Sequence, residues 1–249
     1  MAEDLSYFKG SDCNDCPIRA RAVCSRCQPH ELAELELIKS YVTYRAGETL
    51  VWAGDTMHFV GSVVTGVATI SHTLEDGRRQ MVGLLLPGDF VGRPGRERAQ
   101  FDVTAATDLV LCRFRRRPFE QLLERTPHLS ERLLEMTLDE LDSAREWMLV
   151  LGRKSAREKI ASLLAVLARR YALLHRQNLE GGAVEFELPL TREAIADYLG
   201  LTLETVSRQI SALKREGVIE LPGTRRVRVP DYARLLAETG DDADGGLPA

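Results

Sequence analysis

The sequence predicts an α+β protein in which an antiparallel β-roll, one long helix and a C-terminal group of short helices follow one another along the chain. Three observations lead to this fold class. Between Tyr41 and about Phe114, short apolar runs are separated by glycine-containing turns, which is typical of antiparallel strands. After Pro127, leucines recur at three- and four-residue spacing, which is typical of a helix. From Pro189 to Val229, capping residues and glycines mark two short helices and a hairpin.

Composition and charge exclude several classes of protein. The length of 249 residues suits one large domain or two small ones. No apolar run approaches the ~18–20 residues of a membrane span and no export signal opens the chain, so we expect a soluble, cytoplasmic protein with no membrane partner. The five histidines are scattered without nucleophile–base spacing, so we do not expect an enzyme. The formal net charge of -4 does not suggest nucleic-acid binding, but such a sum overlooks locally clustered basic residues.

Four of the five cysteines lie close together near the start of the chain, and the fifth lies far from them. In order they are Cys13, Cys16, Cys24, Cys27 and Cys112. An iron–sulfur cluster needs about four thiolate ligands, which three N-terminal cysteines and Cys112 would supply while tying the start of the chain to the roll. The two CxxC pairs also suit a zinc ion, although zinc would leave Cys112 unused. Unliganded thiols are the third alternative, and a disulfide framework is not expected because the count is odd.

The segment before the roll has two parts. Residues 1–29 show little apolar periodicity and could not fold alone, whereas His30–Ser40 is predicted to form a short amphipathic helix. Within the roll, Glu75–Gly77 between alternating runs predicts a β-hairpin. In the last strand of the roll, alternation places Cys112 on the face opposite Leu111.

A short helix is predicted from Pro118 and a much longer one from Pro127. The long helix has a narrow apolar stripe, which is typical of the seam between two helices, although Ala144 and Arg145 interrupt it. The stripe consists of Leu134, Leu138, Leu141, Met148 and Leu151. Because the rest of the helix is polar and acidic, we expect residues 127–154 to pair two subunits in a homodimer. Packing of this helix against its own domain is the alternative.

The C-terminal region has the spacing of a helix-turn-helix. Thr191 is predicted to cap a helix over Arg192–Leu199, and Gly200 supplies the turn. Thr202 is predicted to cap a second helix over Leu203–Glu216.

The second of these helices divides into two faces. Its apolar side is predicted to contain Leu203, Val206, Ile210 and Leu213. Glu204, Ser207, Arg208 and Ser211 fall on the other side. An arginine can grip guanine with two donors and a glutamate can accept from cytosine, so Glu204, Ser207 and Arg208 are predicted to read DNA bases.

A hairpin is predicted after the second helix, with Val218–Leu221 as its first strand and Pro222-Gly223 as its turn. Its cations are Arg225, Arg226 and Arg228. We interpret it as a wing that brings positive charge to DNA phosphates, and we expect Thr202 and Thr205 to contact the backbone as well.

These features divide the chain into five parts. They are a cysteine-rich segment (1–29), a sensory β-roll (30–126), a dimerisation helix (127–154), a winged helix-turn-helix domain (155–235) and an acidic tail expected to be disordered (236–249).

From Cys13 to about Val229 the chain resembles the CRP/FNR family of transcription factors, and within it the FNR-type oxygen-responsive, FnrL/FnrN-like branch. Glu204-Thr205-Val206-Ser207-Arg208 matches the ExxSR signature of FNR-type proteins, and Leu199–Thr202 fits the family turn. The resemblance implies a cyclic-nucleotide-binding-like β-roll, palindromic double-stranded DNA sites with TTGAT-like halves, and RNA polymerase as a partner of an activator.

The resemblance also implies a [4Fe-4S] cluster held by three N-terminal cysteines and one from the roll. The spacing Cys13-x2-Cys16-x7-Cys24 favours these three together with Cys112, with Cys27 as the alternative to Cys24. Our hypothesis is that the cluster promotes dimerisation and DNA binding without oxygen. A nitric-oxide sensor using the same cluster, or a haem-gated or small-molecule-gated regulator, is the alternative.

Nucleotide-binding relatives carry Gly-Glu-Leu, followed by an arginine and a small hydroxyl residue, for the cyclic phosphate. Here the corresponding stretch is Gly88-Asp89-Phe90, and no Arg-Ser or Arg-Thr pair follows. We therefore expect the roll to work without cAMP.

Overall fold

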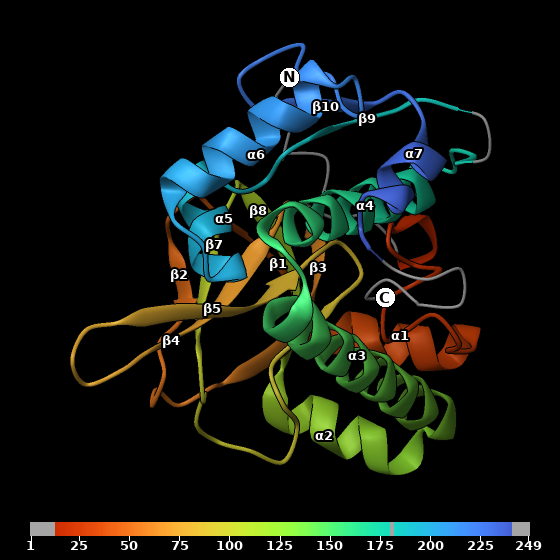
Figure 1. The fold of residues 1–249 in the computed structure, drawn as a ribbon. Coiled ribbons are helices and arrows are strands. Elements are labelled where there is room, and N and C mark those ends of the chain that lie inside the picture. Colours follow the sequence, from red (N-terminus) through yellow and green to blue (C-terminus); the bar gives the residue numbers. More distant parts are fainter. Residues whose placement is uncertain (1–12, 180–181, 241–249) are drawn as a thin grey trace. The chain divides into compact units, whose positions relative to one another are not determined.

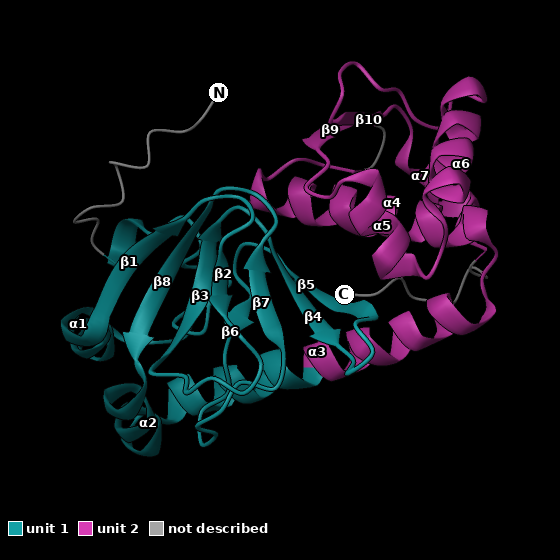
Figure 2. Ribbon diagram, turned by 90° about the vertical axis from the view of Figure 1, so that its left-hand side faces the viewer, with its two compact units in different colours: residues 1–138 teal, residues 139–249 magenta. Residues whose placement is uncertain are grey.

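The computed structural model describes residues 13–179 and 182–240, which separate into two compact units within residues 1–138 and 139–249 (Figure 2). The long helix α3 (Pro127–Arg153) contributes residues to both units. Among the helices of the described residues, none has the length and apolar character needed to cross a membrane.

The first unit is the predicted antiparallel β-roll with helices attached. Its strands are β1 (Lys39–Tyr44), β2 (Thr49–Val51), β3 (Phe59–Thr65), β4 (Ala68–Thr73), β5 (Arg79–Leu85), β6 (Phe90–Val91), β7 (Asp102–Ala105) and β8 (Leu109–Arg115). They form two four-stranded sheets in the orders β1-β8-β3-β6 and β2-β7-β4-β5. Helix α1 (Pro29–Ile38) precedes the roll, and α2 (Arg116–Arg125) leads from it into α3 (Figure 1). The roll and the long helix predicted from periodicity are therefore confirmed.

Two boundaries beside the roll differ from the predictions by two residues. The first helix ends at Ile38 instead of Ser40, because Lys39 and Ser40 already pair with Phe114 and Arg113 in the sheet. Helix α2 begins at Arg116, before the predicted start at Pro118. The predicted hairpin is present between β4 and β5, where Gly77 adopts a φ of 86°, a conformation that glycine accepts most readily.

Strand β8 is buried on both faces. Leu109 and Leu111 belong to the core between the two sheets. Cys112, together with Val110 and Phe114, belongs to a second core that also contains the cysteine-rich segment and α1. The predicted alternation is confirmed, and it places Cys112 on the outer face of the roll, beneath the N-terminal segment.

Helix α3 has two apolar sides. Leu129 is fully buried, and Leu133 and Met136 pack against the core that contains the cysteines. All residues of the predicted stripe are exposed in the single chain, namely Leu134, Leu138, Leu141, Met148 and Leu151. The stripe therefore stays largely uncovered by the rest of the described residues.

The second unit contains α4 (Ala156–Leu174), β9 (Val184–Glu187), α5 (Arg192–Leu199), α6 (Leu203–Arg215), β10 (Arg226–Val229) and α7 (Tyr232–Ala237). The predicted caps are confirmed. The Thr191 hydroxyl accepts a hydrogen bond from the Ala194 N–H (3.1 Å), and the Thr202 hydroxyl accepts one from the Thr205 N–H (3.2 Å). Gly200 lies at φ 62° in the turn between the two helices, as a helix C-terminus requires.

The predicted hairpin of the wing is partly wrong. Strand β10 pairs antiparallel with β9, not with 218–221, which contributes a single bridge between Glu220 and Arg228. The physical reason is that Val227 and Val229 alternate inward in register with Phe186 and Val184, so pairing with β9 buries four apolar side chains.

The expectation of a disordered tail over 236–249 is wrong for its first residues. Helix α7 extends to Ala237, Glu238 forms an ion pair with Arg157 (2.6 Å), and Thr239 is buried. These contacts attach residues 236–240 to the second unit. The acidic residues of the tail lie at 241–249, outside the described residues.

Candidate cysteine centre and nucleic-acid interface

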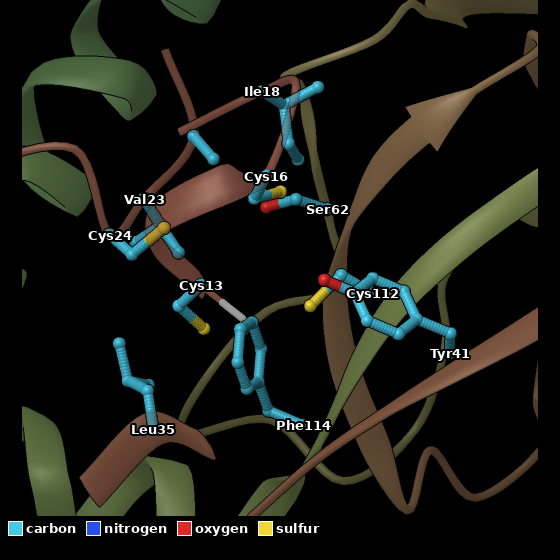
Figure 3. A pocket seen from close by; sticks show the side chains of 11 residues that line it. Cys13, Cys16, Ile18, Val23, Cys24, Leu35, Tyr41, Ser62, Cys112 and Phe114 are labelled. Atoms are coloured by element: carbon cyan, nitrogen blue, oxygen red, sulfur yellow. The ribbon is translucent and has the colours of Figure 1, made fainter. Parts of the chain in front are cut away.

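Four cysteines from separate parts of the sequence line one cavity beside the roll. Cys13 lies in a short 3-10 helix and Cys16 directly follows it. Cys24 lies in a turn of the same segment, and Cys112 lies on β8 (Figure 3). The cavity has about 340 Å³ of empty space, its opening to solvent included. Apart from the thiols, Ser62 and the Tyr41 ring, its wall is aliphatic or aromatic.

The cysteine-rich segment is folded by its own contacts and by burial. Ile18 and Val23 are almost completely buried in the core that contains Cys112. The Arg19 guanidinium donates to the carbonyl oxygens of Cys24 (2.5 Å) and Cys27 (2.9 Å), which closes the loop between the two CxxC pairs. The segment thus uses the roll as its folding surface, as expected for residues that could not fold alone.

Cys13 has the most polar surroundings of the four. Its backbone N–H donates to the Glu36 carboxylate (2.7 Å), and the Lys39 ammonium donates to its Sγ (3.2 Å). Burial raises the pKa of Cys13, and the hydrogen bond and charge of Lys39 oppose that rise. The pKa of Lys39 is itself raised, because its bonds to Cys13 and Glu36 outweigh the effect of burial. A cation beside a thiol favours its thiolate, the form that binds metals.

Burial favours the neutral form of two of the other thiols, Cys24 and Cys112. Burial raises the pKa of Cys24 to about 11 and holds that of Cys112 well above its ordinary range. Negative charge on Cys16, Cys24 or Cys13 contributes to this rise in the Cys112 pKa, as expected for thiols that line one cavity. A positively charged group in the cavity would reverse this preference, because metal coordination deprotonates thiols.

Cys27 is buried but stands apart from the cavity. Of the cysteines in the described residues, Cys13, Cys16, Cys24 and Cys112 line the cavity and Cys27 does not. Burial raises the pKa of Cys27 to about 12. The geometry thus favours Cys24 over Cys27 as a ligand, and the ligand role itself stays a prediction.

The four cavity thiols are better suited to a multi-atom cofactor than to a single metal ion. Within residues 13–179 and 182–240, no group of three or more His, Cys, Asp or Glu side chains is arranged to hold a metal ion. The four thiols instead surround a cavity with mostly apolar walls. Four cysteine sulfurs around such a space fit the ligand requirement of an iron–sulfur cluster.

Polar contacts join the cysteine-rich segment to α3. The Arg132 guanidinium donates to the Arg21 carbonyl (3.0 Å) and pairs with Glu135 (3.1 Å), which also pairs with Arg26 (2.7 Å). We call Arg26, Arg132 and Glu135 the arginine–glutamate clamp. The sequence shows only that Arg132 and Glu135 are one helical turn apart, and nothing in it indicates Arg21 or Arg26 as partners. Sequence reasoning also did not single out Ser62, which lines the cavity beside the cysteines.

The exposed face of α6 is the candidate DNA-reading surface. Val206, Ile210 and Leu213 are buried, whereas the opposite row is exposed as predicted, namely Glu204, Ser207, Arg208 and Ser211. The placement of Leu203 on the buried side is wrong, since its side chain is 53% exposed. It is the first residue of α6, and helical side chains lean toward the N-terminus, so it lies beyond the packed part of the helix.

Three of the four residues predicted to contact the DNA backbone have intramolecular side-chain partners. Thr202 and Thr205 bond to each other at the cap of α6 (Oγ1–Oγ1 2.9 Å). In the wing, Arg225 is exposed, and Arg226 lies 3.6 Å from the Glu185 carboxylate. Exposed ion pairs of this kind contribute little, so phosphate could replace Glu185 as a partner of Arg226.

Family models match both halves of the chain. The model of the cyclic nucleotide-binding domain matches residues 41–126, and that of the Crp-like helix-turn-helix domain matches residues 158–238. A roll of the first kind joined to a DNA-binding domain of the second defines a class of transcription regulators.

Individual relatives place the chain within this class. It is 68% identical to the transcriptional activator protein FnrL of Cereibacter sphaeroides over 95% of each chain. It is 42% identical to the nitrogen fixation regulation protein FixK of Bradyrhizobium diazoefficiens over 89% of this chain and 90% of FixK. The structure of FixK2 from Bradyrhizobium japonicum matches with a TM-score of 0.73 and 32% identity, over 83% of this chain and 100% of that one. The chain belongs to the CRP/FNR family of transcription regulators, and within it to the FNR and FixK type.

Proposed function

We propose that this protein is an oxygen-responsive activator that binds palindromic, TTGAT-like DNA sites as a homodimer while its cysteines hold a [4Fe-4S] cluster. The observation that supports it most directly is the arrangement of Cys13, Cys16, Cys24 and Cys112 around one cavity. When bound, the cluster would supply an oxygen-labile link between the N-terminal segment and β8. Nitric oxide attacks the same kind of cluster and is the alternative signal.

The chain offers a direct physical path from the cysteines to the dimer surface. On one side of α3, Leu129, Leu133 and Met136 pack into the core that contains the cysteines. The arginine–glutamate clamp attaches the cysteine-rich segment to the same part of the helix. An ordered segment therefore restrains α3, and its release removes both the packing and the clamp.

The other side of α3 is the proposed contact with a second copy of the chain. The exposed stripe begins at Leu134, within one turn of the clamp residues Arg132 and Glu135. The five large apolar side chains of the stripe are exposed on one helix, which suits a two-stranded seam. Dimeric helix-turn-helix proteins read half-sites roughly 34–36 Å apart, so pairing through α3 would allow two α6 helices to act on one palindrome.

The names of the relatives, FnrL as a transcriptional activator above all, support activation as the sign of regulation. We propose RNA polymerase as the partner of the DNA-bound dimer in the cytoplasm. We also propose that the roll works without cAMP. Asp89, which stands where nucleotide-binding relatives have glutamate, uses its carboxylate to accept the Leu86 N–H (2.8 Å).

The proposal is tested by measuring iron and acid-labile sulfide after anaerobic purification. We expect about four irons and four sulfides per chain and a brown protein. Exposure to air should remove the colour and the affinity for DNA together, and protein purified in air with a chelator is the control. One zinc per colourless chain would contradict the proposal, and a Soret band would indicate haem instead.

Replacing Arg208 with alanine should weaken binding to the preferred palindrome by about 1–3 kcal/mol for each half-site and abolish the preference at one base pair. The reason is the loss of a two-donor contact with a base edge. Fluorescence anisotropy with the preferred site and with single-base variants would measure both effects. Arg215→Ala, at the far end of α6, is the matched control. An equal loss on all sequences would make Arg208 a phosphate contact.

A further inference from the structure

Ser62 is a buried serine on the wall of the cysteine cavity. It lies on β3, directly opposite Cys112 on β8, and its side chain points toward the thiols near Cys16 (Figure 3). The residue is 1% exposed, and its Oγ finds no hydrogen-bond partner among the described residues. None of the surrounding thiols serves as an acceptor for this hydroxyl.

An unpartnered buried hydroxyl is unusual and costly. Folding removes it from water, and in native proteins the large majority of such groups recover a hydrogen bond. The hydroxyl of Ser62 faces a space lined by four sulfurs, so the partner that would satisfy it is a sulfur acceptor brought into that space.

We propose that Ser62 donates its O–H to a sulfur of the bound iron–sulfur cluster and so stabilises the cluster in the cavity. This inference rests on the proposed function. Hydrogen bonds to the sulfurs are one of the ways in which a protein sets the potential and stability of a cluster. The hydroxyl is unsatisfied without the cluster and satisfied with it, so its effect on stability should have opposite signs in the two forms.

The chain contains a matched control. Ser71 on β4 is also fully buried, and its Oγ likewise has no partner in the described part of the chain. Ser71 belongs to the other sheet and does not line the cavity. Replacing either serine with alanine removes a buried hydroxyl that lacks a hydrogen-bond partner among the described residues. Of these two serines, Ser62 faces the cysteines and Ser71 does not.

The experiment compares Ser62→Ala and Ser71→Ala with the wild-type full-length chain, both metal-free and loaded with iron and sulfide under anaerobic conditions. For the metal-free protein, both variants should melt about 2–4 °C higher than the wild type, because each loses an unsatisfied group. For the loaded protein, Ser62→Ala should lose its visible absorbance to a chelator about 10-fold faster, whereas Ser71→Ala should match the wild type.

Loss of absorbance at the wild-type rate in Ser62→Ala would overturn the inference and leave the proposed function intact. Faster loss in both variants would also overturn it, since the effect would then be general destabilisation. If the wild-type chain takes up no iron, the proposed function fails, and the role of Ser62 fails with it.

Discussion

Replacing Cys112 with serine should reduce the iron content of the anaerobic protein from about four atoms per chain to nearly none. The change replaces a single sulfur atom on β8 with oxygen, and serine is a poor ligand for iron. The fold should therefore tolerate the change while the cavity loses the ligand that we propose from the roll. Iron and sulfide assays, with the visible absorption spectrum, measure this result. The affinity for the palindrome should fall with it.

Cys27→Ser is the matched control for this experiment. Cys27 is buried to nearly the same extent as Cys112, 6% against 7% exposed, but it lies off the cavity. Serine there should cost some stability, measured as a lower melting temperature, while the iron content stays at its wild-type value. Iron loss in Cys27→Ser with retention in Cys112→Ser would show that our choice of ligands is wrong.

Replacing Leu138 with glutamate should convert the proposed dimer into monomers and lower the affinity for a palindromic site at least about 100-fold. Leu138 is 51% exposed in the single chain, so the change should alter the stability of the subunit little. In the proposed dimer, two glutamates would meet in an apolar seam, where juxtaposed like charges cost several kcal/mol. Sedimentation velocity and DNA-binding titrations, both anaerobic, would measure the two effects.

Leu74→Glu is the control for this substitution, since Leu74 is a leucine of similar exposure (46%) in the β4–β5 hairpin. It should leave the dimer and the affinity for DNA unchanged. The iron content of Leu138→Glu should also remain normal, because the outer stripe does not line the cavity. A fully dimeric Leu138→Glu with unchanged affinity would show that subunits pair through another surface.

Features that depend on neighbouring residues were predictable from the sequence. The caps at Thr191 and Thr202 confine α5 and α6 to nearly the predicted bounds, because capping is a contact across three residues. The alternation in β8 correctly separated Cys112 from Leu111. The helical period of α3 predicted a stripe whose five members are all exposed, although it left out Leu149, which is exposed as well.

Features that depend on which distant segments meet were not predictable. The sequence offered Cys24 and Cys27 as equivalent members of one CxxC pair, and only the packing of the segment on the roll placed one at the cavity and the other away from it. The pairing of β10 with β9 likewise depended on burial of valines against a strand about forty residues earlier.

By itself, the sequence determined the order of roll, long helix and helix-turn-helix, because period and capping are local. Only the tertiary structure decided that Ser62 faces the cysteines and that Arg26 reaches Glu135. Such juxtapositions arise from the simultaneous packing of several elements, each of which is consistent with many partners when considered alone. The candidate centre belongs to this second kind, since its four sulfurs come from a segment and a strand nearly ninety residues apart.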